Sequence, residues 1–105
     1  MSTREYAGQT VDVDPEGFLV DSSKWNRDVA REIAAEVGIP QLSDKHWQVI
    51  EFCRKDAEEK GEAPGLRRIS QHSGVNMKEL YQLFPKGPGK LAARVSGLKK
   101  PHSCI

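Results

Sequence analysis

The sequence predicts a small α+β protein, with an N-terminal β-hairpin or meander packed on an orthogonal array of about five helices and a flexible C-terminal arm. Strand-forming residues concentrate in the first twenty positions, and apolar residues then recur at helical spacing, with Gly and Pro between the segments. A chain of 105 residues can bury one modest core. We therefore expect a single domain over residues 1–96 and an arm over residues 97–105.

The N-terminal segment has the composition of short strands joined by a turn. Its strand formers are Tyr6, Thr10, Val11, Val13, Phe18 and Val20. Between them, Asp14-Pro15-Glu16-Gly17 has turn chemistry, because proline presets the backbone angle of a turn and glycine tolerates a positive φ. A hairpin or meander around this turn follows.

Two amphipathic helices are expected next. The first is capped by Ser22 or Ser23 and ends at Gly38, and its apolar face repeats every four residues, at Trp25, Val29, Ile33 and Val37. The second is capped by Ser43, runs to about Lys60 and stops at the glycine that follows. Its charged end, DAEEKGE, should be solvated.

Three shorter helices complete the predicted domain. GLRRISQHSG forms the first and is closed by Ser73-Gly74, and Asn76 caps the second, MKELYQLF. A rigid turn over residues 85–89 precedes KLAARVSG, which makes about two helical turns before Gly97 releases the arm.

Composition excludes several classes of function. Sixteen basic and fifteen acidic residues leave a net charge of +1, which gives no strong footprint for nucleic acid. Two cysteines are too few for a disulfide scaffold, and no apolar stretch approaches the roughly 20 residues of a membrane span. The start, MSTREYAGQT, has no apolar run typical of a signal peptide. A cytoplasmic location with reduced thiols is expected.

The arm, GLKKPHSCI, places Cys104 one residue from the chain end, where no core can surround it. Either this thiol is incidental or the arm serves to present sulfur. Sulfur exchange needs an accessible thiolate that reaches into a partner protein, and a terminal arm of about 20 Å provides this. The positive charges of Lys99, Lys100 and a protonated His102 favour the thiolate, whereas the terminal carboxylate opposes it.

Residues 80–105, LYQLFPKGPGKLAARVSGLKKPHSCI, resemble the C-terminal signature of the DsrC and TusE family of sulfur-relay proteins. YAGQTVDVDPEGFL, SDKHWQVIEF and EAPGLRRIS are similar to the family's first hairpin, central helix and A-P-x-x-R helix, so the likeness covers nearly the whole chain. The resemblance implies that Cys104 is the cysteine that carries a persulfide. It also implies that Arg67, the arginine of A-P-x-x-R, lies where the arm can dock.

Three departures from the family pattern leave the subfamily open. Sulfite reductase subunits of the family carry a second cysteine eleven residues before the penultimate one, where this chain has Ala93. A disulfide within the arm is therefore impossible, which argues against a complete functional role as a sulfite reductase gamma subunit. The GLPKP of the family reads GLKKP here, and the insertion typical of TusE before MKELYQLF is missing.

The sequence thus predicts a persulfide carrier rather than a turnover enzyme, in tRNA thiolation or in dissimilatory sulfur metabolism. Its partners would be an upstream protein sulfur donor and a downstream acceptor complex, contacted through Arg67, Lys99, Lys100, Pro101 and His102. No cofactor, metal or membrane is expected. We expect a monomer that forms a disulfide dimer through Cys104 when oxidised.

Two alternatives stay open. One is a protein like the sulfite reductase gamma subunit. The other is a DNA-binding regulator, because GLRRISQHSGVNMKELYQLF resembles a helix-turn-helix; its second helix, however, offers only Lys78, balanced by Glu79. Duplex binding that depends on salt and survives loss of Cys104 would favour the regulator.

The remaining reactive residues have plainer interpretations. Cys53, one helical turn from Val49 and Ala57, is expected to be a buried structural thiol. His46 and His72 are expected on helix surfaces, and Arg68 on a solvated face. His102 and Cys104 alone are too few ligands for a metal site.

Overall fold

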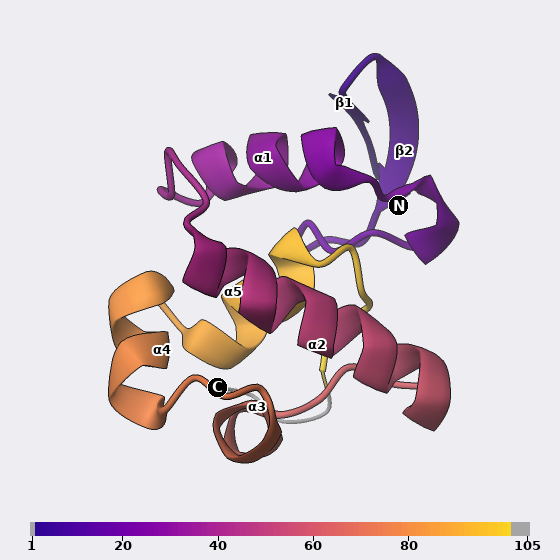
Figure 1. Cartoon of the computed structure of the whole chain (residues 1–105). Helices are drawn as coiled ribbons and strands as arrows, with labels where there is room; N and C mark the ends of the chain where they lie inside the picture. Colours follow the sequence, from indigo (N-terminus) through magenta and orange to yellow (C-terminus); the bar gives the residue numbers. More distant parts are fainter. Residues whose placement is uncertain (1, 102–105) are drawn as a thin grey trace.

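The computed structural model describes residues 2–101 (Figure 1). Its elements in chain order are β1 (Ser2–Tyr6), β2 (Gln9–Val13), the 3-10 helix η1 (Ser22–Lys24), α1 (Arg27–Glu36), α2 (Asp44–Lys60), α3 (Leu66–His72), α4 (Met77–Leu83) and α5 (Pro88–Val95). The two strands form one antiparallel sheet, so the predicted α+β architecture with five α-helices is confirmed. No helix within residues 2–101 is long and apolar enough to cross a membrane.

The hairpin turns earlier than the sequence suggests. β1 pairs with β2 from Ser2 opposite Val13 to Tyr6 opposite Gln9, so the turn is Ala7-Gly8, with φ values of 52° and 78°. Two consecutive positive φ angles match the right-handed twist of a two-residue hairpin. Sequence analysis missed this turn because alanine rarely takes a positive φ.

The expected Asp14–Gly17 turn does form and adds a third segment to the meander. The Asp14 carboxylate accepts hydrogen bonds from the backbone N–H groups of Glu16 (2.9 Å) and Phe18 (3.0 Å). The turn then returns the chain so that Leu19 makes an isolated antiparallel bridge with Val13.

The cap expected for the first helix is wrong. Asn26 caps α1, because its backbone is extended and its side-chain oxygen accepts a hydrogen bond of 2.8 Å from the Val29 N–H. Ser22 and Ser23 belong instead to η1, which is capped by Asp21. Trp25 therefore lies between the two helices, outside the regular face of α1.

The long helix α2 begins and ends as predicted, with Ser43 as its cap and Gly61, at φ 81°, just after it. His46, however, is buried rather than on the surface. Its Nδ1 accepts a hydrogen bond of 3.0 Å from the Ser43 N–H, and its Nε2 lies 2.9 Å from the Leu83 carbonyl oxygen. The ring also meets Phe84 edge-on, with 5.2 Å between ring centroids. His72 is exposed, as expected.

The last helix, α5, lies at the centre of the fold and packs against α1, α2, α3 and α4 (Figure 1). It begins at Pro88, inside the segment predicted to be a turn, because proline suits the first helical position. Ala92 and Ala93 are buried, and their small side chains let neighbouring helices approach closely. The largest fully buried side chains of the described core include Phe84, Leu19, Ile33, Ile50, Ile69 and Leu80.

Glu36 at the end of α1 ties the hairpin to α5. Its carboxylate accepts hydrogen bonds from the Tyr6 hydroxyl (2.8 Å) and Arg94 Nη2 (2.5 Å), and it pairs with Arg4. Two elements far apart in the sequence, β1 and α5, are thus both bonded to a carboxylate of α1.

Candidate functional site

The residues predicted for the site are placed as follows. Cys104 and His102 lie outside the described residues. Lys99 and Lys100 are exposed just after the end of α5, whereas Pro101 is buried. Arg67 is exposed on α3.

The chain leaves α5 through a tight, well-bonded segment that we call the arm root, residues 95–98. Gly97 has a φ of 71°, a conformation that glycine adopts without strain. The Gly97 N–H donates to the Arg94 carbonyl (3.1 Å), and the Leu98 N–H donates to the Ala93 carbonyl (3.0 Å). Leu98 is buried and belongs to the hydrophobic core. Gly97 thus ends the helix, as predicted, but Leu98 after it is still packed in the core.

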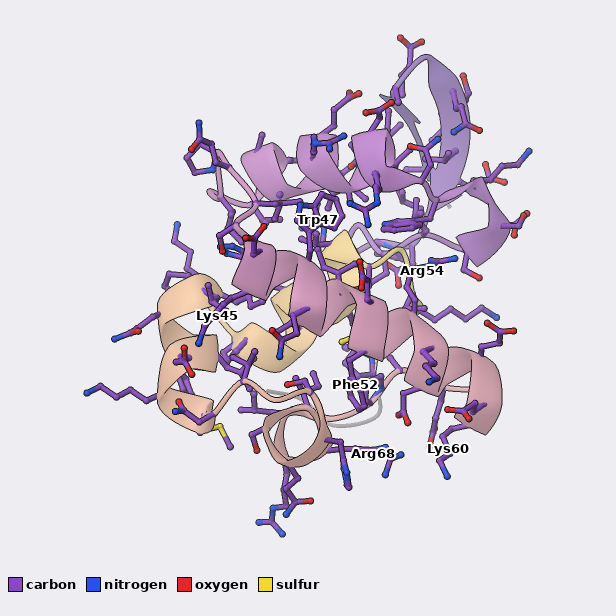
Figure 2. The ribbon with its side chains drawn as sticks, in the orientation of Figure 1. Lys45, Trp47, Phe52, Arg54, Lys60 and Arg68 are labelled. Carbon is purple, nitrogen blue, oxygen red and sulfur yellow. The ribbon has the colours of Figure 1, made fainter. Side chains whose placement is uncertain are left out.

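Trp25 and Arg54 bind the arm root from two different elements. The indole N–H of Trp25 donates a hydrogen bond of 2.8 Å to the Val95 carbonyl. Arg54, which points from α2 toward η1 in Figure 2, donates from Nη1 to the Ser96 carbonyl at 2.8 Å. Its guanidinium carbon lies 4.1 Å from the centre of the Trp25 ring, at cation–π distance. Sequence analysis did not identify either residue as part of the site.

A groove of about 770 Å³ lies beside the arm root. Leu98 and Lys99 form one wall, and Arg54 and Lys55 of α2 lie on another side. The remaining lining residues are Val20, Asp21, Ser22, Ala57, Glu58, Gly61, Glu62 and Ala63.

Beyond the arm root, the chain makes further contact with the turn after β2. Lys100 Nζ lies 2.6 Å from a carboxylate oxygen of Glu16. Both side chains are largely exposed, so the ion pair contributes only a few tenths of a kcal/mol. Pro101 is buried. The mobility predicted for residues 97–105 stays a prediction.

The two adjacent arginines of α3 differ in their surroundings. Arg68 makes a two-pronged ion pair with Asp56 of α2, with Nε–Oδ2 and Nη2–Oδ1 distances of 2.8 and 2.6 Å. The side chain of Arg67, by contrast, makes no hydrogen bond or ion pair within residues 2–101. Arg67 is therefore the arginine that α3 presents to solvent.

The Asp56–Arg68 pair corrects two expectations. Asp56 belongs to the segment predicted to be solvated, yet it is only 3% exposed, and Arg68 is not on a simple solvated face. Hydrogen bonding to Arg68 holds the pKa of the Asp56 carboxyl below its usual value, although burial opposes this. The pair joins α2 to α3 and so fixes the helix that carries Arg67.

Cys53 is fully buried in α2, as predicted. Burial raises the pKa of the Cys53 thiol to about 12; interaction with the Ser96 hydroxyl lowers it, and the charge of Asp56 raises it further. A thiol with so high a pKa is almost entirely protonated at neutral pH, and therefore it is a poor nucleophile.

The raised pKa of Cys53 makes folding stability sensitive to alkaline pH. The folded protein holds this proton more tightly than the unfolded chain, so the stabilisation is complete below pH 9 and is lost as pH rises toward 12. At pH 10.5 the loss should be about 2 kcal/mol. At neutral pH, Cys53→Ala should cost about 1 to 2 kcal/mol through lost packing.

Urea unfolding of both proteins at pH 7.5 and 10.5, in a Cys104→Ser background that prevents oxidation, measures this effect. Because only the chain with Cys53 carries the titrating thiol, its advantage over Cys53→Ala should disappear at the higher pH. An equal difference in unfolding free energy at both pH values would contradict the expectation.

Metal binding and DNA binding are the two other functions for which the chain offers residues. No group of three or more His, Cys, Asp and Glu side chains that could hold a metal ion occurs within residues 2–101. The predicted helix pair α3–α4 is present, with Gly74 at φ 84° between its members. Of the two charges on α4, Glu79 is paired with Lys45 of α2, and the exposed large apolar side chains are Met77 and Tyr81.

Together, the fold and the arm root define a small α+β body that holds the start of a cysteine-bearing C-terminal arm. A family model described as DsrC-like protein matches residues 5–105, and the chain belongs to this family. The gamma subunit of dissimilatory-type sulfite reductase from Nitratidesulfovibrio vulgaris is 35% identical over the whole of both chains. Sulfurtransferase TusE from Escherichia coli is 38% identical, with 95% of this chain and 97% of TusE covered.

A solved structure supports the same assignment. The oxidized gamma subunit of dissimilatory sulfite reductase from Archaeoglobus fulgidus, DsrC, superposes with a TM-score of 0.85 at 32% identity, covering 99% of this chain and 100% of that one. The relatives thus include both proteins named as sulfurtransferases and proteins named as reductase subunits, as the sequence motifs indicate.

Proposed function

We propose that this protein is a cytoplasmic sulfur carrier that accepts a persulfide on Cys104 and delivers it to a partner protein. The observation that carries the proposal is the family match, which runs through residue 105 and so includes the penultimate cysteine. The relatives named sulfurtransferases support a role in sulfur transfer.

The chemistry needs no cofactor. The Cys104 thiolate attacks the outer sulfur of a donor's persulfide; a new S–S bond forms on Cys104, the donor's S–S bond breaks, and the donor cysteine leaves as a thiolate. Delivery repeats the step in the other direction, with an acceptor thiolate attacking the sulfur carried by Cys104. No net oxidation occurs in either step, so neither step needs an external oxidant or reductant.

The second cysteine does not fit this role. Cys53 is buried, and burial raises the pKa of its thiol to about 12, so almost none of it is thiolate at pH 7. Arg67, Lys99, Lys100, Pro101 and His102 are proposed to contact the donor or acceptor, as part of the arm or beside its docking surface.

A role as a complete sulfite reductase gamma subunit is less well supported. Ala93 stands at the position of the second cysteine and is only 1% exposed within α5. Without a thiol there, Cys104 cannot form a disulfide within the arm. The protein is therefore proposed to work with one sulfur at a time, as a monomer that gives a Cys104-linked dimer only on oxidation.

Mass spectrometry of the loaded protein tests the proposal. After incubation with a persulfide-loaded sulfurtransferase, the peptide ending at Ile105 should gain about 32 Da, the mass of one sulfur atom, and should lose it on reduction. The peptide that contains Cys53 should keep its mass and serves as an internal control. Sulfur found on Cys53, or on neither cysteine, would contradict the proposed function.

A further inference from the structure

We propose that Trp25 and Arg54 are positioning residues for sulfur transfer, and we call this pair the root clamp. The clamp fixes the point and the direction in which the arm leaves the body, and so determines where the cysteine meets a partner protein. The inference rests on the proposed function and concerns residues that do not touch the reacting sulfur.

The clamp acts on two consecutive carbonyl groups at the end of α5. Trp25 Nε1–H donates to Val95 O, and Arg54 Nη1 donates to Ser96 O, both at 2.8 Å. Carbonyls at a helix C-terminus have no partner within the helix, and a cation placed there is favoured by the helix dipole. Two directed bonds to adjacent carbonyls fix the orientation of the last turn as well as its position.

The two clamp residues also hold each other. The Arg54 guanidinium stacks on the Trp25 ring at 4.1 Å, and Arg54 Nη2 lies 3.4 Å from the Ser22 carbonyl in η1. Because of these contacts, the arginine is held between α2, η1 and the arm root. The pair is therefore organised independently of any residue in the arm beyond position 96.

Gly97 completes the arrangement. A Cβ atom built at this position would overlap the Trp25 ring, so only glycine lets the chain pass directly beneath the indole. The chain then turns at φ 71° and runs along the wall of the groove through Leu98 and Lys99. The indole ring thus covers the backbone at Gly97, where the arm begins.

Direction at the root matters because Cys104 is seven residues beyond Gly97. The clamp fixes the start of residues 98–101, which stay on the body, because Leu98 is in the core, Lys100 pairs with Glu16 and Pro101 is buried. Cys104 follows three residues after Pro101, and three extended residues span only about 10 Å, so the position of Pro101 limits where the thiol can reach. Transfer between two proteins requires sulfur atoms held within near contact, and misplacement of about 1 Å already costs about 100-fold in rate in well-organised sites.

The test compares a protein donor with a small one. Arg54→Met removes the hydrogen bonds that Arg54 makes to the carbonyl oxygens of Ser96 and Ser22, but it keeps an unbranched side chain beside Trp25. We expect kcat/KM for sulfur uptake from a persulfide-loaded rhodanese-type sulfurtransferase to fall at least about tenfold. The rate with glutathione persulfide, which needs no docking geometry, should stay within about twofold of wild type. Arg54→Lys, which keeps the charge and one donor, should be intermediate.

Arg27→Met is the matched control. Arg27 stacks on Trp47 at 4.6 Å, so this variant removes an arginine–tryptophan pair of the same kind that has no bond to the arm root. It should transfer sulfur from both donors like wild type. Trp25→Phe, which keeps an aromatic ring but loses the N–H donor, provides a second clamp variant if Arg54→Met does not fold.

The outcomes separate this inference from the proposed function. A wild-type protein that accepts sulfur from neither donor would overturn the proposed function and the clamp's role with it. Wild-type loading together with an unchanged protein-donor rate in the folded clamp variants would overturn the clamp alone. An equal loss with both donors would also overturn it, because the clamp would then be affecting the thiol's own reactivity rather than its placement.

Discussion

Replacing Cys104 with serine should abolish sulfur uptake while leaving the fold intact. The hydroxyl of serine is not ionised at neutral pH and cannot attack a persulfide sulfur, so no S–S bond can form at position 104. Serine is nearly the same size as cysteine, so we expect the free energy of unfolding to change by less than about 0.5 kcal/mol. Intact-mass measurement after incubation with a persulfide donor should show no gain of about 32 Da.

Cys53→Ala is the matched control for this variant. It removes the other thiol of the chain but leaves the proposed nucleophile, so it should load as completely as wild type. Cys104→Ser should thus fold normally but take up no sulfur, whereas Cys53→Ala should take up sulfur but be less stable. If Cys104→Ser took up as much sulfur as wild type, the carrier proposal would be wrong.

Local sequence signals predicted the helices accurately where a side chain near in sequence makes the decisive contact. Ser43 and Asn76 cap the helices they were expected to cap, and Gly61 follows α2 in the left-handed conformation. The capping hydrogen bonds of Ser43 and Asn76 join residues three positions apart, so the pattern of residue types is enough to identify them.

Some errors were local, since the Ala7-Gly8 turn and the Asn26 cap depend on neighbouring residues, but others occurred where residues far apart in sequence decide the structure. His46 is buried because its ring reaches the Leu83 carbonyl and Phe84, which belong to the other end of the helical array. The shift of the first helix start to Asn26 leaves Trp25 free to bond with Val95, seventy positions away. Neither contact has a signature in local spacing.

The same distinction applies to the candidate site. The sequence motif predicted Cys104 and Arg67 as site residues, which stay predictions, and the end of α5 at Gly97, which is confirmed. The root clamp has no such mark, since Arg54 lies 42 positions from the carbonyl that it binds. Likewise, the adjacent residues Arg67 and Arg68 give no local sign that Arg68 is the one paired with a carboxylate.

The difference between these two arginines leads to the second large expected effect. Arg68→Ala should lower the free energy of unfolding at pH 7, because it leaves the nearly buried Asp56 carboxylate without its partner. Arg67→Ala, on the same short helix, should change it by less than about 0.5 kcal/mol, since its side chain makes no such contact within residues 2–101. Urea unfolding of both variants and wild type measures the two effects.

Acid pH provides an independent check on the cause. The pKa of Asp56 is lowered in the folded protein, so the pair stabilises the fold above the ordinary carboxyl pKa of about 4 and loses this effect as pH falls through the lowered value. The difference in unfolding free energy between wild type and Arg68→Ala should therefore become smaller as pH falls below 4. A constant deficit would mean that the arginine acts through packing of its stem rather than through its charge.

A double variant then separates the ion pair from the cost of breaking it. Removing both charges, as in Asp56→Leu with Arg68→Ala, no longer leaves an unpaired buried carboxylate, and replacing buried ion pairs by apolar groups is often nearly neutral. We expect the double variant to be more stable than Arg68→Ala alone at pH 7. If the two substitutions were simply additive, Asp56 and Arg68 would not be coupled, and the joint between α2 and α3 would have to come from the apolar contacts around Ile69.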